Sequence, residues 1–461
     1  MPAGAPRISP RTAAGRASAT CCCGHPSRSS GPTCCSGDSW RAGAARCCRA
    51  SPPSACSSST PASGSSGPAA MPKTFLLTDE FPPVQTGIAR LMGEIARRYP
   101  KGELLVSTGQ HRDASETDGA YATATLDRLP LSTRALRNII GLMLWSRRVA
   151  SLARQHKPRF AWCDSIRPAG YPAKWTHERV GTKYGVLVHG GDLLKELHGV
   201  HHSRRARRTA LALLGSAVSV VANSQWTREQ AQKVLRELGL DPLAEHVKVV
   251  PLGTDPEQFK PGLDTRDVRA RYRLNGDLWA VTVARLEPYK GVDTALRAVA
   301  AARNGGRDLH YLVIGEGKKG KEYKKLAREL GIGDAVRFTG NVPDRDLPAL
   351  YNTAQVYLGV SRRADATRVE GFGVALAEAS ACGLPVIAGQ SGGLAEAVKD
   401  GDTGFVVEPT DVEAVTVALQ RLLADQLLAR RVGQAARKSV ESYYNWDRVI
   451  RDLREIESQI A

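Results

Sequence analysis

Two acidic residues and two glycines mark a segment of the sequence whose residue types and spacing could do chemistry. Glu370 precedes Gly371-Phe372-Gly373, and Glu378 follows an uncharged run. Glycines let backbone N–H groups approach a ligand, and a helix start favours an anion. Carboxylates accept hydrogen bonds from sugar hydroxyls. Two exposed acids near a helix start are the alternative, which the glycine pair disfavours.

Two cations form a second candidate feature in Ala284-Arg285-Leu286-Glu287-Pro288-Tyr289-Lys290-Gly291. Arg285 ends an apolar strand-like run, and Lys290 precedes a helical pattern. Ligands of open α/β sheets bind at the carboxyl ends of strands. Cations at that place suit a diphosphate leaving group, whose developing charge must be stabilised. Taken alone, the pair is better interpreted as two ordinary surface cations.

Two further positions carry weaker signals. His189 ends an apolar run in Val188-His189-Gly190-Gly191-Asp192, and Gly87 lies in the loop after the first apolar run. A histidine after a strand is more often structural than functional, so neither position predicts a site by itself.

The elements that must position these residues alternate along the chain. Short apolar runs alternate with amphipathic helical stretches, which is typical of βαβ units and parallel sheets. We therefore expect an α/β fold with two tandem doubly wound, Rossmann-like domains that face a cleft. The expected strands cover 74–78, 103–107, 159–163, 184–188, 217–222, 247–251, 279–284, 309–314, 336–339, 355–359, 384–388 and 404–407. The expected second-half helices cover about 291–303, 321–330, 346–353, 373–382, 392–399 and 411–424.

Domain boundaries follow from this alternation and from composition. We expect a first domain over 71–255, a second over 256–440, and a closing helix over 441–461. Residues 1–70 hold eight of the ten cysteines and almost no large aliphatic residues. Such a stretch cannot bury enough apolar surface to fold. We interpret it as a disordered extension or as a mis-assigned start upstream of Met71.

The overall composition excludes several classes of protein. The 461 residues carry a net charge of +18, and 42% are apolar, so the chain is globular. Only Cys163 and Cys382 lie outside the first 70 residues, which indicates a reducing compartment. The apolar part of Thr209–Thr227 is too short to span a membrane. Aromatic residues make up only 6%, and no nucleic-acid-binding module is evident, so no nucleic acid partner is expected.

Three motifs look functional but have simpler explanations. Residues 315–320 match G-x-G-x-x-G, yet no acid ends the next strand, so a tight strand-to-helix turn is the better interpretation. Asp344-Arg345-Asp346 and Asp400-Gly401-Asp402 read D-x-D, but the first opens a helix and the second is a glycine turn. No metal site is therefore predicted.

Together these residues resemble glycosyltransferase family 4, retaining enzymes of the GT-B fold. The resemblance runs from about Met71 to the C-terminus. It rests on the Glu370–Glu378 spacing with its E-G-F-G start, on Val249–Asp255, on Ser391-Gly392-Gly393 and on the stretch around Trp446. Within the family, Glu370–Gly393 looks most like bacterial phosphatidylinositol mannoside mannosyltransferases. At the position after His189, those enzymes usually carry another histidine and an acid. This chain has Gly190-Gly191-Asp192 there instead.

The resemblance implies a role for each candidate residue. The implied catalytic residues are His189, Arg285, Lys290 and Glu370, and the implied donor-binding residues are Gly87, Gly371, Phe372, Gly373 and Glu378. The two cations would hold the donor diphosphate. Glu370 and the backbone of Gly371–Gly373 would hold the donor sugar, and Glu378 would contact the ribose of the nucleotide. Gly87 would let the first domain close over the phosphates, and His189 would line the junction between sugar and acceptor. The family is thought to attack from the same face, without a metal or a cofactor.

The resemblance and the charge distribution together predict the partners. We expect a nucleotide-sugar donor, with GDP-mannose favoured and a UDP-sugar with a soluble or polysaccharide acceptor as the alternative. Basic residues surround the apolar stretch 139–145, and four arginines lie within 204–208. A basic amphipathic helix can dock on anionic lipid, which suits a lipid-linked acceptor. We therefore expect a cytoplasmic protein that can bind peripherally at the inner face of the membrane. A solvated helix face, or a non-catalytic basic binding protein, remains the alternative.

Overall fold

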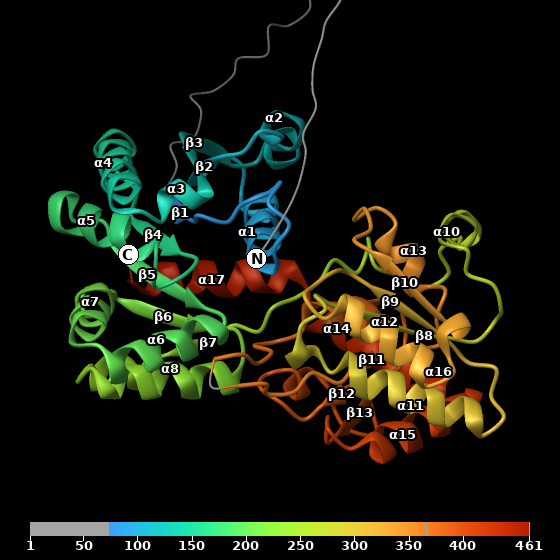
Figure 1. Ribbon diagram of the computed structural model, residues 1–461. Helices are drawn as coiled ribbons and strands as arrows, with labels where there is room; N and C mark the ends of the chain where they lie inside the picture. Colours follow the sequence, from blue (N-terminus) through green and yellow to red (C-terminus); the bar gives the residue numbers. More distant parts are fainter. Residues whose placement is uncertain (1–72, 366, 461) are drawn as a thin grey trace, which may run out of the picture. The chain divides into compact units, whose positions relative to one another are not determined.

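Parallel strands form two separate sheets in the computed structural model, which describes residues 73–365 and 367–460 (Figure 1). The first sheet has seven strands in the order β3-β2-β1-β4-β5-β6-β7. Its strands are β1 (Thr74–Leu77), β2 (Leu104–Gln110), β3 (Thr125–Ser132), β4 (Phe160–Cys163), β5 (Lys183–Val188), β6 (Ser219–Ala222) and β7 (Lys248–Val249). Every pairing between neighbouring strands in it is parallel.

The second sheet has six strands in the order β10-β9-β8-β11-β12-β13, again all parallel. Its strands are β8 (Trp279–Val283), β9 (His310–Ile314), β10 (Val336–Gly340), β11 (Val356–Gly359), β12 (Val386–Gly389) and β13 (Gly404–Val407). The first strand of each sheet, β1 or β8, lies in the interior of that sheet. The order of the strands reverses next to it, which is the doubly wound pattern.

Helices cover both faces of each sheet, which explains why the central strands are apolar along their whole length. All residues of β1, β4, β6, β11 and β12 are buried. Helices among the first-sheet strands are α1 (Gly87–Arg98), α2 (Ala114–Thr117), α3 (Thr133–Leu136), α4 (Ile139–His156), α5 (Gly170–Val180), α6 (Gly191–His202), α7 (Arg204–Leu214), α8 (Gln225–Glu237) and α9 (Asp241–Glu245). The later helices are α10 (Arg266–Tyr272), α11 (Val292–Asn304), α12 (Gly320–Glu329), α13 (Leu347–Tyr351), α14 (Val374–Ala381), α15 (Val412–Ala424), α16 (Gln426–Ser442) and α17 (Trp446–Ile460).

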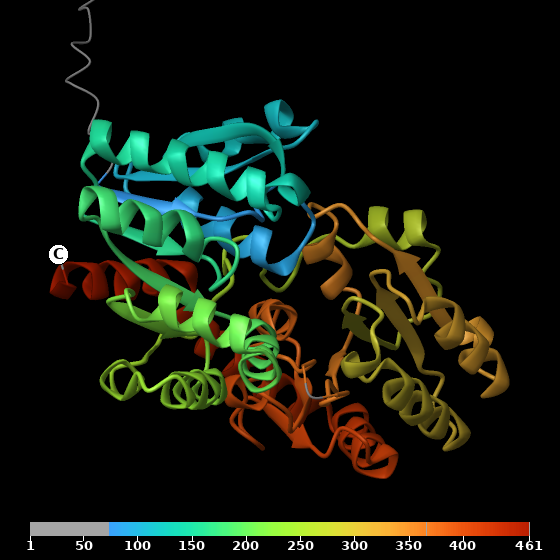
Figure 2. The ribbon, with the colours of Figure 1, turned by 60° about the vertical axis from the view of Figure 1, so that its left-hand side comes forward.

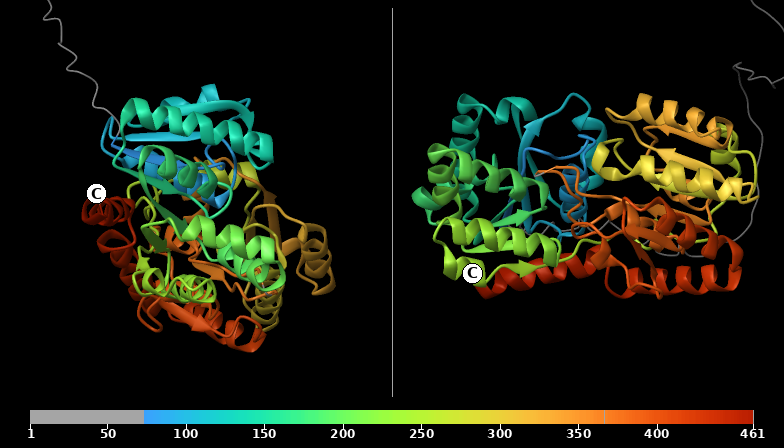
Figure 3. Two further views of the ribbon diagram at one scale, coloured as in Figure 1. Left: turned by 90° about the vertical axis from the view of Figure 1, so that its left-hand side faces the viewer. Right: turned by 60° about the horizontal axis from the view of Figure 1, so that its bottom comes forward.

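The last helix, α17, returns to the first sheet. Its residues Trp446, Ile450 and Leu453 share a hydrophobic core with Met92 of α1 and Trp162 of β4. Figures 2 and 3 show this helix in red beside the blue and green elements of the first sheet. The first strand and the last helix of the described residues therefore share one hydrophobic core.

A buried carboxylate anchors α17 to the sheet. Glu457 accepts hydrogen bonds from the hydroxyls of Thr74 and Tyr99 and from the indole of Trp162. Burial raises the pKa of Glu457 above 4.5, although these donors work to lower it. A buried charge with a full set of donors specifies where the helix lies.

The predicted fold class is confirmed, with two differences in detail. Strand β3 was not expected, because Thr125–Ser132 is partly exposed and contains Asp127, Arg128 and Pro130 instead of an apolar run. The helix expected over 392–399 is wrong: the structure has only a short 3-10 turn there, Ala395–Ala397. Residues 1–70 lie outside the described residues.

The predicted domain boundaries stay a prediction. All described residues belong to one unit of the chain, Ser66–Ala461. The structure itself places the end of the first sheet at Val249 and the start of the second at Trp279.

Candidate active site

The candidate residues gather after the carboxyl ends of strands. His189 directly follows β5, Arg285 lies two residues after β8, and Glu370 lies in the loop between β11 and α14. Gly87 is the first residue of α1, which follows β1. This is the edge where ligands of doubly wound sheets bind.

Lys290 and Glu370 form an ion pair between Nζ and Oε2. Their side chains are 17% and 18% exposed, so the pair is shielded but reachable. Burial works to lower the pKa of Lys290, but the charge and hydrogen bond of Glu370 and the nearby Tyr289 together outweigh it, and the pKa is raised. Lys290 therefore stays cationic at neutral pH.

Gly291 explains how Lys290 reaches this position. It has a φ of +67°, and a Cβ there would lie 1.9 Å from the carbonyl oxygen of Val360, just beyond β11. Only glycine permits this approach. The loop after β8 is thus pressed against the loop that leads to Glu370.

Arg285 is exposed, and its Nη2 donates to the Tyr289 hydroxyl at 3.2 Å. Among the described residues it makes no ion pair. The G-x-G-x-x-G segment supports its loop: the Leu286 N–H donates to the Glu316 carbonyl at 2.9 Å, and a Cβ at Gly317 would meet the Leu286 backbone at 2.5 Å. The interpretation as a strand-to-helix turn is confirmed, since β9 ends at Ile314 and α12 begins at Gly320.

Gly371 packs directly against His189, which brings the two halves of the predicted site together. A Cβ at Gly371 would lie 2.1 Å from the His189 carbonyl oxygen. From the other side, the Gly393 N–H donates to the Glu370 carbonyl at 3.0 Å. Gly373, with a φ of +92°, precedes the first residue of α14. The glycines therefore serve close packing between loops, in addition to any role toward a ligand.

The imidazole of His189 is fixed by the strand next to its own. Its Nε2 lies 2.9 Å from the carbonyl oxygen of Asp164, the residue after β4. A carbonyl only accepts, so Nε2 carries the proton and Nδ1 is left as an acceptor. The His189 backbone N–H donates to Asp192 Oδ1 at 3.0 Å.

Two acidic residues that were not predicted lie near His189: Asp164, whose carbonyl contacts the imidazole, and Asp79, which interacts with Asp164. Asp164 accepts from the Ser165 hydroxyl at 2.8 Å, and Asp79 pairs with Arg137 at 2.5 Å. Burial raises the pKa of both carboxyls. Asp164 directly follows β4, and Asp79 lies two residues after β1. That placement after strands is the signal that could have identified them.

Glu378 is buried in α14 and bound on both oxygens. Arg90 Nη1 lies 2.8 Å from Oε1, and the Tyr351 hydroxyl donates to Oε2 at 2.9 Å. Burial raises the pKa of Glu378, against the effect of Arg90. Arg90 and Tyr351 were not predicted, because no local pattern links them to Glu378.

The last two candidates differ in environment. The Phe372 side chain is 3% exposed, and its ring centroid lies 5.9 Å from that of Tyr444. Its side chain therefore packs within the fold, and its role in donor binding stays a prediction. Gly87 is exposed, and a Cβ there would meet nothing within 4 Å. Its role in donor binding stays a prediction.

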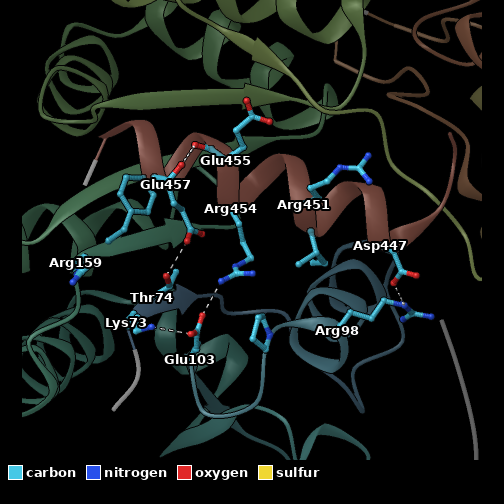
Figure 4. A pocket seen from close by; sticks show the side chains of 14 residues that line it. Lys73, Thr74, Arg98, Glu103, Arg159, Asp447, Arg451, Arg454, Glu455 and Glu457 are labelled. Carbon is cyan, nitrogen blue, oxygen red and sulfur yellow. Dashed lines mark hydrogen bonds and ion pairs between the residues drawn. The ribbon is translucent and has the colours of Figure 1, made fainter. Parts of the chain in front are cut away.

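One well-formed cavity lies away from these residues. It measures about 630 Å³ and is lined by α17 and by residues at the opposite, amino-terminal ends of the strands, such as Thr74 and Phe160 (Figure 4). Its acids are largely paired: Glu103 binds Lys73 and Arg454. We therefore assign the site by strand ends and not by cavity size.

The described residues contain neither a membrane-spanning helix nor a cluster of metal ligands. No helix within 73–460 is both long and apolar enough to cross a bilayer. No group of three or more His, Cys, Asp or Glu side chains in that part of the chain could hold a metal ion.

Comparison with known proteins shows the family of the chain. The family model described as glycosyl transferases group 1 matches residues 264–439, a range that includes seven of the nine candidate positions. The GDP-mannose-dependent α-(1-6)-phosphatidylinositol monomannoside mannosyltransferase of Mycolicibacterium smegmatis is 32% identical over 383 residues, covering 81% of this chain and 94% of the relative. A monoacylated-substrate counterpart from Corynebacterium glutamicum is 27% identical and covers 81% and 95%.

Solved structures share the two-sheet architecture. Anabaena Alr3699/HepE, in complex with UDP and glucose, has a TM-score of 0.67 at 20% identity, over 84% of this chain and 99% of that one. The sucrose-phosphate synthase of Thermosynechococcus elongatus has a TM-score of 0.64 at 21% identity, over 84% and 98%. These likenesses establish the GT-B type of fold.

Proposed function

The chain belongs to the group 1 glycosyl transferases, and from this premise we propose that it transfers a mannosyl group from GDP-mannose to a phosphatidylinositol mannoside or a similar lipid-linked acceptor. The single observation that carries the donor and acceptor is the relative from Mycolicibacterium smegmatis, 32% identical over 94% of its length. The geometry at the strand ends supplies the chemistry.

The cations support departure of a nucleoside diphosphate. When the bond between sugar C1 and the phosphate oxygen breaks, negative charge develops on the diphosphate. Lys290 is held cationic in a shielded position, and Arg285 lies on the same loop with an exposed guanidinium. Charges fixed before the reaction stabilise such a leaving group most effectively.

Glu370 has two tasks in this account. Its carboxylate orients the Lys290 ammonium, and its remaining oxygen faces hydroxyl groups of the donor sugar. The bond from C1 to the acceptor oxygen forms on the face from which the diphosphate leaves, and the acceptor proton passes to a phosphate oxygen. The reaction then needs neither a metal nor a cofactor, and this part of the proposal follows the family.

His189 and the acids beside it lie on the acceptor side. The unprotonated Nδ1 of His189 can accept a hydrogen bond from a sugar hydroxyl, since Nε2 is engaged by Asp164. Gly371 contacts the His189 carbonyl, so donor-side and acceptor-side loops meet at this point. The cluster around Asp79 and Arg137 suits a polyhydroxylated headgroup.

The tip of α4 supports a lipid-linked acceptor. Ile139 and Ile140 are each 72% exposed, and Met143 and Leu144 are more than 40% exposed. Arg134 and Arg147 are exposed beside them, and Arg137 ties this tip to Asp79 at the active edge. Apolar side chains ringed by cations favour an anionic bilayer surface. We place the enzyme at the membrane periphery through this tip.

Nucleotide selectivity tests the proposed donor. Thermal shift of the full chain is measured with GDP, UDP and ADP, with and without a chelator. A ligand at 100 times its dissociation constant adds about 2.7 kcal/mol of stability. We expect a chelator-insensitive shift with GDP that exceeds the shift with UDP. A larger shift with UDP contradicts the mannosyl assignment, and no shift with any nucleotide contradicts the donor site itself.

A further inference from the structure

The Glu378 carboxylate is enclosed by protein groups. Arg90 Nη1 lies 2.8 Å from one oxygen, and the Tyr351 hydroxyl lies 2.9 Å from the other. The Glu378 side chain is only 2% exposed. A ribose diol can reach a carboxylate this deeply buried only if one of these two groups moves aside.

The two partners differ in how readily they can leave. Tyr351 is fully buried on α13, and its hydroxyl also lies 3.1 Å from the Ala375 carbonyl in the same half of the chain. The Arg90 side chain is 32% exposed and comes from α1, which covers the other sheet. A long, partly solvated side chain can withdraw into water, whereas a buried phenol cannot. Arg90 is the replaceable partner.

Other groups favour Arg90 where it lies. Its guanidinium carbon is 5.6 Å from the centre of the Phe259 ring. Glu378 raises the pKa of Arg90, and Asp344 and Glu94 act in the same direction. A ligand therefore has to compete with a cation that several groups attract.

We propose that Arg90 and Glu378 form a latch that the ribose of the donor opens. This inference rests on the proposed function, because it assumes a nucleotide-sugar donor. Arg90 lies in the first turn of α1, three residues after Gly87. Opening the latch releases this turn from α14. Ribose recognition is thereby coupled to the position of Gly87, and the latch lowers affinity for every ligand that needs the Glu378 carboxylate.

Calorimetric titration of the full chain tests the latch. GDP and 2′,3′-dideoxy-GDP are titrated at pH 8 into wild type, Arg90→Ala and Arg97→Ala. Arg97 lies on the same helix and pairs with Glu94, so its variant is the matched control. Coupling between two competing binding events changes affinity by about fivefold at the low end of its usual range. We expect Arg90→Ala to bind GDP up to about fivefold more tightly and the dideoxy ligand as wild type does. Arg97→Ala should change neither.

The outcomes separate the latch from the proposed function. GDP affinity that Arg90→Ala leaves unchanged or weakens overturns the latch while the donor assignment stands. An equal gain for both ligands also overturns it, because the ribose hydroxyls then play no part. If neither wild type nor Arg90→Ala binds a nucleoside diphosphate, the proposed function fails and the latch with it. If Arg90→Ala does not fold, Arg90→Gln replaces it, because this variant removes the charge with a smaller change in volume. The affinities of Arg90→Gln for GDP and for 2′,3′-dideoxy-GDP are then compared with those of wild type in the same way.

Discussion

The ammonium of Lys290 is paired with the carboxylate of Glu370, so a cation after β8 and an acid before α14 form one unit. Neither side chain is fully buried, and neither is freely solvated. Such a pair contributes little to folding, because desolvation offsets the attraction. The pair instead holds the Lys290 ammonium in place for a leaving group and the Glu370 carboxylate in place to accept hydrogen bonds from hydroxyls.

Replacing either member by alanine should abolish most transfer and leave the fold intact. We expect Lys290→Ala and Glu370→Ala each to lower kcat by about 100- to 1000-fold, the usual effect of losing one fixed group that stabilises transition-state charge. Lys319→Ala is the control, since Lys319 pairs with Glu322 on the surface of the same half. Near-normal turnover in both variants contradicts the site assignment.

Alanine at Gly371 should destabilise the protein and misplace His189. The new Cβ would lie 2.1 Å from the His189 carbonyl oxygen, which is backbone and cannot move away alone. We expect a loss of about 1–3 kcal/mol in the free energy of unfolding, as for other overpacked sites, and lower transfer. Gly87→Ala is the control for stability, because a Cβ there meets nothing within 4 Å. Equal stability of the two variants in urea would contradict the packing account.

Polar side chains at the tip of α4 should weaken membrane binding without affecting the fold. We expect Ile139→Ser with Ile140→Ser to lower affinity for anionic vesicles more than tenfold, since each buried isoleucine contributes about 1.5–3 kcal/mol. Val417→Ser with Leu427→Ser is the control, because both residues are exposed but lie in the other half of the chain. Vesicle flotation that responds equally to both double variants would rule out a specific α4 surface.

The buried Glu457 should make stability depend on pH. Its pKa is raised above 4.5 by burial, so the folded state binds its proton more tightly than the unfolded state. The stability that it contributes is complete below about pH 4.5 and falls as pH rises through the raised pKa. In urea titrations across this range, Glu457→Gln should remove that decline, and Glu455→Gln, on the exposed side of α17, should not. Parallel profiles for all three proteins would show that Glu457 titrates normally.

The sequence predicted the fold well because central parallel strands are apolar throughout. Runs such as 74–78 and 355–359 stand out for that reason. Strand β3 lies at the edge of its sheet, where solvent allows Asp127 and Pro130. It therefore carries no such signal.

The site could be predicted only in part for a related reason. Lys290 and Glu370 follow strand ends, and topology brings such ends together. Arg90 lies on the face of a helix that has no local signal for a site, and its contact with Glu378 joins distant parts of the chain. The tight glycine packing around Gly371 and Gly393 also depends on the tertiary fold, and it explains why a regular helix does not form over 392–399.

Mannosyl transfer itself tests the central claim most directly. The full chain is incubated with radiolabelled GDP-mannose and phosphatidylinositol monomannoside in anionic vesicles, and the lipid products are separated. We predict a product with one additional mannose, formed by wild type and not by Lys290→Ala or Glu370→Ala. Transfer only from a UDP-sugar, or no transfer by a folded protein that binds GDP, would contradict the assignment of donor and acceptor.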